Sequence, residues 1–96
     1  DDLVARYGGE EIFILLPNTY SVDAGNMARR ICTGLSQKLF VGDHSPIMLT
    51  ASFGVAERIS SNVSRIEDLI DEADKALYSA KKNGKNRVEI TKITSV

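Results

Sequence analysis

No segment constrains this chain more than residues 6–12, Arg-Tyr-Gly-Gly-Glu-Glu-Ile. The adjacent glycines Gly8 and Gly9 stand between two apolar runs, residues 3–5 and 12–16. A Gly-Gly pair between strand-like runs indicates a tight hairpin, because primed turns need a positive φ, which glycine adopts at little cost. The sequence therefore predicts two strands joined by a bend at these glycines. A uniformly apolar run such as 12–16 is typical of a strand covered on both faces.

The same segment also carries residues that could bind a phosphate group and a divalent cation. Because Gly8 and Gly9 have no Cβ, a phosphate or a base could approach the backbone closely. Glu10 and Glu11 carry hard oxygen ligands for a divalent cation, which would in turn hold phosphates. Taken alone, such a segment is more often a plain turn beside solvated glutamates, so the rest of the chain must decide.

Three further segments follow in a fixed order: residues 49–56, Leu-Thr-Ala-Ser-Phe-Gly-Val-Ala; residues 73–81, Ala-Asp-Lys-Ala-Leu-Tyr-Ser-Ala-Lys; and residues 83–88, Asn-Gly-Lys-Asn-Arg-Val. Together with the glycine segment they resemble the GGDEF family, the diguanylate cyclase domains of bacterial signalling proteins. The resemblance runs from Asp2 to about Ile90. It implies an α/β (α+β) fold with a mostly antiparallel sheet and packed helices, the palm-like fold of nucleotide cyclases.

Family domains begin before the glycine segment, with a strand that carries a metal-binding aspartate and a following lysine. No segment of that kind occurs in residues 1–96. We therefore expect this chain to be one partial GGDEF domain, roughly its C-terminal three-fifths. The isolated chain should be inactive, and part of the run 12–16 should be left uncovered.

The resemblance implies that two molecules of GTP are joined into cyclic di-GMP with release of pyrophosphate. By the same resemblance, Glu10 would bind Mg²⁺ or Mn²⁺ and take the hydroxyl proton, and such cations suit phosphoryl chemistry. Successive strand residues point to opposite faces, so Glu10 and Glu11 reach one cation only where the bend distorts the strand. Glu11 is then a weaker ligand or a positioning group.

Basic residues near the end of the chain match positions that contact the triphosphate in relatives. Lys81 and Lys85 are these residues, while Gly8 and Gly9 would give the nucleotide backbone access. The alternative for both lysines is a solvated helix end, where cations complement the helix dipole.

Two other residues match the product-inhibition site of the family. Asp2 corresponds to the aspartate of its Arg-x-x-Asp motif and Arg30 to a second arginine. The arginine of that motif would precede this chain, so the inhibitory site is expected to be partial. Without the resemblance, Arg30 is interpreted as exposed solubilising charge.

Two classes of function remain open for the parent protein. The first is an active cyclase that works as a homodimer, because each domain presents one GTP, under an upstream sensory or receiver domain. The second is a catalytically silent module that binds GTP or cyclic di-GMP and regulates a partner domain.

Composition restricts the partners and the compartment. A net charge of −1 provides no field that attracts nucleic acid, and no apolar run reaches the length of a membrane span. The single cysteine, Cys32, excludes an internal disulfide and is interpreted as a small buried hydrophobe, which favours the cytoplasm.

Periodicity predicts the remaining elements. A helix should begin after an N-cap at Ser21 and continue to Phe40, and an alternating strand should begin at Leu49. A second helix should follow a capping box at residues 64–67 and end before Gly84 in the left-handed cap position. A final strand is predicted over residues 87–91.

Overall fold

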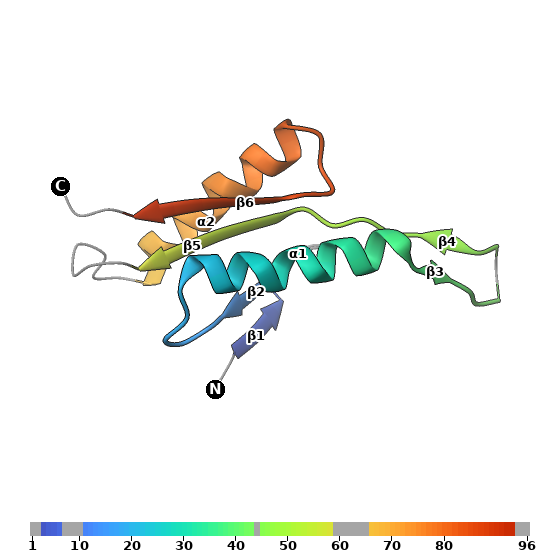
Figure 1. Ribbon diagram of the computed structural model, residues 1–96, viewed down its shortest axis with the longest axis horizontal. Coiled ribbons are helices and arrows are strands. Elements are labelled where there is room, and N and C mark those ends of the chain that lie inside the picture. The colour runs from blue at the N-terminus through green and yellow to red at the C-terminus, as the bar shows by residue number, and fades with distance from the viewer. Residues whose placement is uncertain (1–2, 7–10, 44, 59–65, 94–96) are drawn as a thin grey trace.

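Figure 1 shows the computed structural model, which describes residues 3–6, 11–43, 45–58 and 66–93. In chain order the elements are β1 (Leu3–Arg6), β2 (Ile12–Leu15), α1 (Ser21–Gln37), β3 (Leu39–Phe40), β4 (Ile47–Met48), β5 (Phe53–Arg58), α2 (Ile66–Lys82) and β6 (Val88–Ile93). The predicted α+β class is confirmed.

The described strands form three two-stranded sheets. β1 and β2 pair antiparallel, as the glycine segment predicts, with Val4 opposite Ile14 and Arg6 opposite Ile12. β3 and β4 are also antiparallel, whereas β5 and β6 run parallel along the whole length of both strands. Residues 7–10, which would form the bend of the first hairpin, lie outside the described residues.

The parallel β5–β6 pair is the centre of the fold, because each of its faces carries one helix (Figure 1). A Cβ at Gly54 of β5 would lie 2.2 Å from the carbonyl oxygen of Ala73, so the backbone of α2 lies directly on this glycine. On the other face, a Cβ at Gly25 of α1 would meet Ile90 Cδ1. Small residues on both sides therefore let the helices approach the sheet closely.

Both helices bury an apolar stripe against this sheet, as their periodicity predicts. In α2 the most buried residues are Ala76 and Ala80, with relative exposures of 2% and 0%. In α1 the buried apolar residues are Ala28 and Cys32, so the prediction that Cys32 is buried is confirmed. The core is thus made mainly of small side chains.

The first helix differs from its prediction at both ends. Ser21 is not the N-cap: Tyr20 occupies that position without a side-chain cap, and the backbone N–H of Ser21 donates to the Glu57 carboxylate of β5. A carboxylate from another element therefore satisfies the helix end, which no local pattern indicates. The helix also ends at Gln37 rather than Phe40, because Lys38 is extended and the next two residues form β3.

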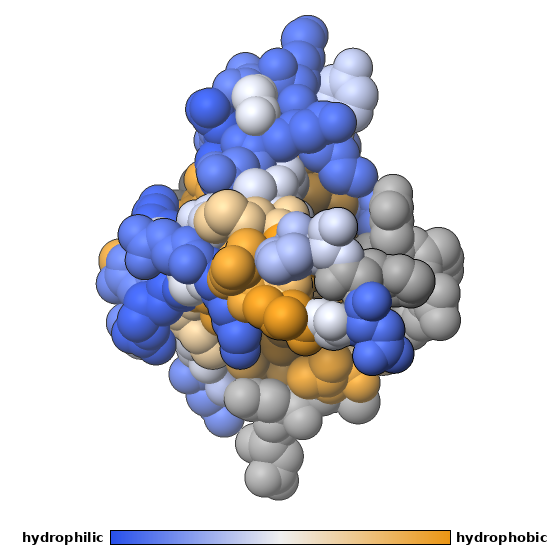
Figure 2. Space-filling view, turned by 90° about the vertical axis from the view of Figure 1, so that its right-hand side faces the viewer, coloured by the Kyte–Doolittle hydropathy of each residue, from blue (hydrophilic) through white to orange (hydrophobic). Residues whose placement is uncertain are grey.

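The β3–β4 hairpin extends beyond the end of α1 (Figure 1). It pairs Leu39 with Met48 and Phe40 with Ile47. Figure 2 views the protein from this end and shows hydrophobic residues at its middle, below a hydrophilic region at the top. The strand predicted from Leu49 begins later, at Phe53, and Leu49 is exposed.

The end of the second helix agrees with its prediction. Gly84 has a φ of 124°, so it takes the left-handed position that only glycine adopts freely. Helix α2 begins at Ile66 in the described residues, and Ser64 of the predicted capping box lies outside them. The last strand, β6, runs to Ile93 rather than to residue 91.

The apolar run 12–16 is not covered on both faces. Ile12 is 69% and Ile14 41% exposed, whereas Phe13 and Leu15 are half-buried. The alternation arises because one face of the β1–β2 pair has no layer upon it among the described residues. The prediction of a partly uncovered run is therefore confirmed. Neither described helix is long and apolar enough to cross a membrane.

Candidate functional site

The predicted site residues that the structure describes come from four places. Glu11 immediately precedes β2, Lys81 lies in the last turn of α2, and Lys85 lies in the loop between α2 and β6. Arg30 is exposed on α1. The remaining predicted residues, Asp2, Gly8, Gly9 and Glu10, lie outside the described residues.

One contact joins the glycine segment to the end of α2. Glu11 Oε2 lies 3.5 Å from Lys81 Nζ, and the two side chains are 40% and 46% exposed. The distance is that of an ion pair rather than of a short charge-assisted hydrogen bond. The pair brings a carboxylate of the first predicted motif beside a lysine of the third, although the two are far apart in the sequence.

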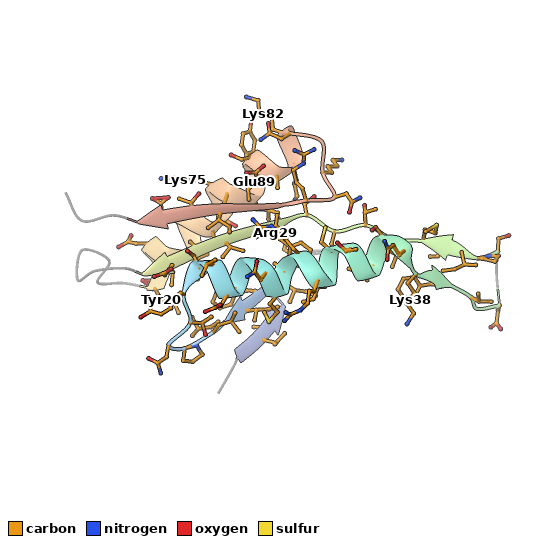
Figure 3. All side chains as sticks on the ribbon, viewed as in Figure 1. Tyr20, Arg29, Lys38, Lys75, Lys82 and Glu89 are labelled. Atoms are coloured by element: carbon orange, nitrogen blue, oxygen red, sulfur yellow. The ribbon has the colours of Figure 1, made fainter. Side chains whose placement is uncertain are left out.

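The C-terminal end of α2 concentrates positive charge. Lys81 and Lys82 occupy its last turn, where cations interact favourably with the helix dipole. Figure 3 shows Lys82 extending outward at this end. The helix closes through hydrogen bonds from Asn83 N to the Ser79 carbonyl oxygen and from Lys85 N to the Ala80 carbonyl oxygen, both 2.9 Å long. Lys81 and Lys85 therefore leave the same helix end.

The loop that carries Lys85 has an unusual backbone. Gly84, Lys85 and Asn86 have φ values of 124°, 64° and 48°, which places three consecutive residues in the left-handed region. Only Gly84 adopts that region freely, and asparagine tolerates it better than most residues. The Lys85 side chain is exposed.

This loop is tied to distant parts of the fold. Asn86 N donates to Ser52 Oγ over 3.2 Å, and the Cys32 thiol lies 3.4 Å from Asn86 Oδ1. Neither a role for Asn86 nor its contact with Cys32 was predicted from the sequence. The signal that could have found it is an asparagine two residues after a cap glycine, because asparagine is enriched at positive φ.

The acidic residues of the site are candidate ligands for a divalent cation. Carboxylate oxygens such as those of Glu11 are the hard donors that Mg²⁺ and Mn²⁺ prefer, so the chemistry of this residue fits such a cation. Among the described residues, however, no group of three or more His, Cys, Asp or Glu side chains surrounds a common point. Glu11 can therefore contribute one ligand, and its ion pair with Lys81 equally suits a positioning role.

Arg30 can be compared with its neighbour on α1. Arg29 Nη1 donates to Asn26 Oδ1 over 3.4 Å along the helix surface, and Figure 3 shows Arg29 near the middle of α1. Both arginines are exposed, and Arg30 lies on the side of α1 opposite its buried residues. Because Asp2 lies outside the described residues, its predicted proximity to Arg30 stays a prediction.

A family profile described as "Diguanylate cyclase, GGDEF domain" matches residues 1–87. Among curated proteins, the chain is 38% identical over 91 residues to diguanylate cyclase A of Treponema denticola, covering 95% of this chain and 24% of that protein. It is also 38% identical over 89 residues to the response regulator PleD of Caulobacter vibrioides, covering 91% of this chain and 19% of that protein.

A solved structure agrees with the sequence relatives. The GGDEF domain of DgcB from Caulobacter crescentus, solved in complex with c-di-GMP, superposes with a TM-score of 0.84 at 28% identity. The match covers 93% of this chain and 53% of that one. The chain thus spans about a quarter or less of the curated relatives and about half of the solved domain.

Proposed function

Because this chain belongs to the GGDEF family of diguanylate cyclase domains, we propose that the protein containing it condenses two molecules of GTP into cyclic di-GMP. In each half of the reaction, the 3′-hydroxyl of one nucleotide attacks the α-phosphate of the other. A new P–O bond forms, the bond between the α- and β-phosphates breaks, and pyrophosphate leaves. Two such steps close the ring and release two molecules of pyrophosphate.

The observation that carries this proposal is the ion pair of Glu11 with Lys81. It joins the acidic segment of the glycine hairpin to the basic end of α2. Phosphoryl transfer of this kind depends chiefly on positioning and on neutralising charge. A carboxylate next to a phosphate-binding lysine meets both needs, because it can orient the ammonium group until the triphosphate arrives.

The roles of the residues follow from their chemistry. Lys81 and Lys85 would neutralise the triphosphate as mobile point charges, which need no bidentate geometry. Gly8 and Gly9 would let the nucleotide approach the backbone. Glu10, with Glu11 as a weaker ligand or positioning group, would hold Mg²⁺ or Mn²⁺, which when bound would stabilise phosphate charge and favour loss of the hydroxyl proton.

The assembly is proposed on the same basis. Each domain presents one GTP, so bond formation requires two domains face to face, and we expect a homodimer. An upstream sensory or receiver domain would control their approach; the similarity to a protein named a response regulator supports this arrangement. GTP is a cytosolic substrate, which favours a cytoplasmic site of action. A silent binding module is less well supported, since the relatives reported above include one named diguanylate cyclase.

The test is to incubate the full-length protein with GTP and Mg²⁺ or Mn²⁺ and to measure cyclic di-GMP and pyrophosphate. Glu10→Gln should abolish most of the product while the circular dichroism spectrum is unchanged, because an amide is a poor metal ligand and a poor base. Omitting the divalent cation should have the same effect. GTP binding without any product from the wild-type protein would instead support the silent module.

A further inference from the structure

We propose that Asn86 is a positioning residue for the nucleotide: it holds the left-handed loop, residues 84–86, so that Lys85 meets the triphosphate. This inference rests on the proposed function, since it assigns a purpose to Lys85. It adds a residue with no charge and no expected contact with GTP. Three observations on the loop carry it.

The first observation is backbone strain at Lys85 itself. Its φ is 64°, in the left-handed region that non-glycine residues rarely adopt. The next residue, Asn86, is also left-handed, with a φ of 48°. A conformation of this kind persists only where the surroundings impose it. The loop must therefore be held by its neighbours.

The second observation is that Asn86 is anchored at both its backbone and its side chain. Its N–H donates to Ser52 Oγ over 3.2 Å, just before β5. Its Oδ1 lies 3.4 Å from the thiol of Cys32, which also lies 3.5 Å from the carbonyl oxygen of Ala51. Cys32 is only 7% exposed, so an exposed loop residue reaches the buried side of α1.

The third observation is that Lys85 is fixed on both sides while its side chain stays exposed. Its N–H donates to the Ala80 carbonyl oxygen over 2.9 Å, and its carbonyl oxygen accepts from Arg87 Nε over 3.3 Å. A Cβ at Gly84 would lie 2.8 Å from Arg87 Nη2, so the guanidinium group covers this glycine. The backbone is held, and the ammonium group is left to contact a ligand.

These contacts of the loop contribute little to the folding stability of the protein. All three loop residues are exposed, and single hydrogen bonds contribute modestly to stability, including the part-buried one between Cys32 and Asn86. A held loop instead lowers the ordering cost of binding, because the lysine is already presented in its bound direction. The expected loss on removing Asn86 is therefore a loss of nucleotide affinity.

The experiment measures KM and kcat for GTP, together with the affinity for Mg²⁺–GTP by calorimetry, on the full-length protein. Asn86→Ala removes Oδ1 and strains the left-handed position. It should raise KM for GTP about tenfold and lower the affinity for Mg²⁺–GTP by the same factor. Asn86→Asp keeps an oxygen acceptor and the tolerance of positive φ, and should restore affinity to within about threefold of the wild type. Asn83→Ala is the matched control, because the Asn83 side chain contacts Glu89 of β6 and not Cys32. This variant should leave the affinity for GTP unchanged.

The double variant separates positioning from a general structural role. Lys85→Ala should weaken binding, and adding Asn86→Ala should cause no further loss, because Asn86 acts only through this lysine. Additive losses, or an Asn86→Ala protein with normal affinity, would overturn the proposal. If Asn86→Ala does not fold, Ser52→Ala removes the other anchor and should show the same dependence on Lys85.

The positioning role of Asn86 and the proposed cyclase activity are contradicted by different results. A wild-type protein that binds GTP but makes no product contradicts the cyclase, while the calorimetric pattern across the variants still decides the role of Asn86. A normal cyclase in which Lys85→Ala leaves GTP affinity unchanged overturns the positioning role alone. A wild-type protein that does not bind GTP overturns both.

Discussion

Glu11 Oε2 lies 3.5 Å from Lys81 Nζ, so this ion pair joins the residue before β2 to the last turn of α2. Both side chains are more than one third exposed, at 40% and 46%. Exposed pairs contribute only about 0.2–1 kcal/mol to folding. On the proposed function, the pair would act mainly by setting the position of Lys81.

We therefore predict that Glu11→Gln changes nucleotide affinity more than stability. The free energy of unfolding should fall by less than about 1 kcal/mol, while KM for GTP should rise several-fold because Lys81 loses its partner. Glu72→Gln is the matched control, since it removes an ion pair of similar length, 3.6 Å to Lys75, within α2. Urea unfolding and steady-state kinetics of both variants provide the comparison; equal KM values would contradict a positioning role.

Gly54 should tolerate no side chain. In Gly54→Ala the new Cβ would lie 2.2 Å from the Ala73 carbonyl oxygen and 2.3 Å from Leu77 N, and backbone atoms cannot turn aside as side chains do. We expect the free energy of unfolding to fall by about 2–3 kcal/mol.

The control for this glycine is Gly34→Ala in α1, where an added Cβ meets nothing within 4 Å. That change should stabilise the domain by about 0.5–1 kcal/mol, because alanine is the better helix former. Thermal and urea unfolding measure both. A Gly54→Ala protein as stable as the wild type would mean that α2 can move away from β5.

Glu57 should act as the cap of α1. Its carboxylate accepts a hydrogen bond from the backbone N–H of Ser21, which is only 2% exposed. Glu57→Ala leaves this buried N–H without its carboxylate partner and should lower the free energy of unfolding by about 1–2 kcal/mol. Glu57→Gln keeps an oxygen acceptor and should lose less. Asp23→Asn, an exposed change in the same helix turn, should cost about 0.5 kcal/mol or less in urea unfolding.

Arg30 should contribute to product feedback. In the full-length protein, Arg30→Ala is expected to weaken the binding of cyclic di-GMP, because a charge-assisted contact to the ligand is lost. Arg29→Ala is the neighbouring control, since Arg29 contacts Asn26 on the helix surface. Calorimetric titration with cyclic di-GMP compares the two. Equal affinities would remove Arg30 from the inhibitory site.

Local elements and family membership could be predicted from the residues alone. Glycines at residues 8 and 9 between apolar runs predicted the β1–β2 pair, and the apolar stripe of residues 66–80 predicted α2 with its left-handed Gly84. These features can be predicted because turns and helices depend on residues that are only a few positions apart.

The contacts between residues far apart in the chain became known only from the folded structure. Glu57 caps α1 in place of Ser21, Cys32 contacts Asn86, and Glu11 pairs with Lys81. α1 ends at Gln37, three residues earlier than its periodicity predicts, because the following residues pair with β4 instead. Such contacts join residues that are remote in the chain, and no local pattern specifies them. The contacts of Glu57 and of Cys32 depend on the packing of α1 against the β5–β6 sheet, and the contact of Glu11 depends on the place of β2 beside the end of α2.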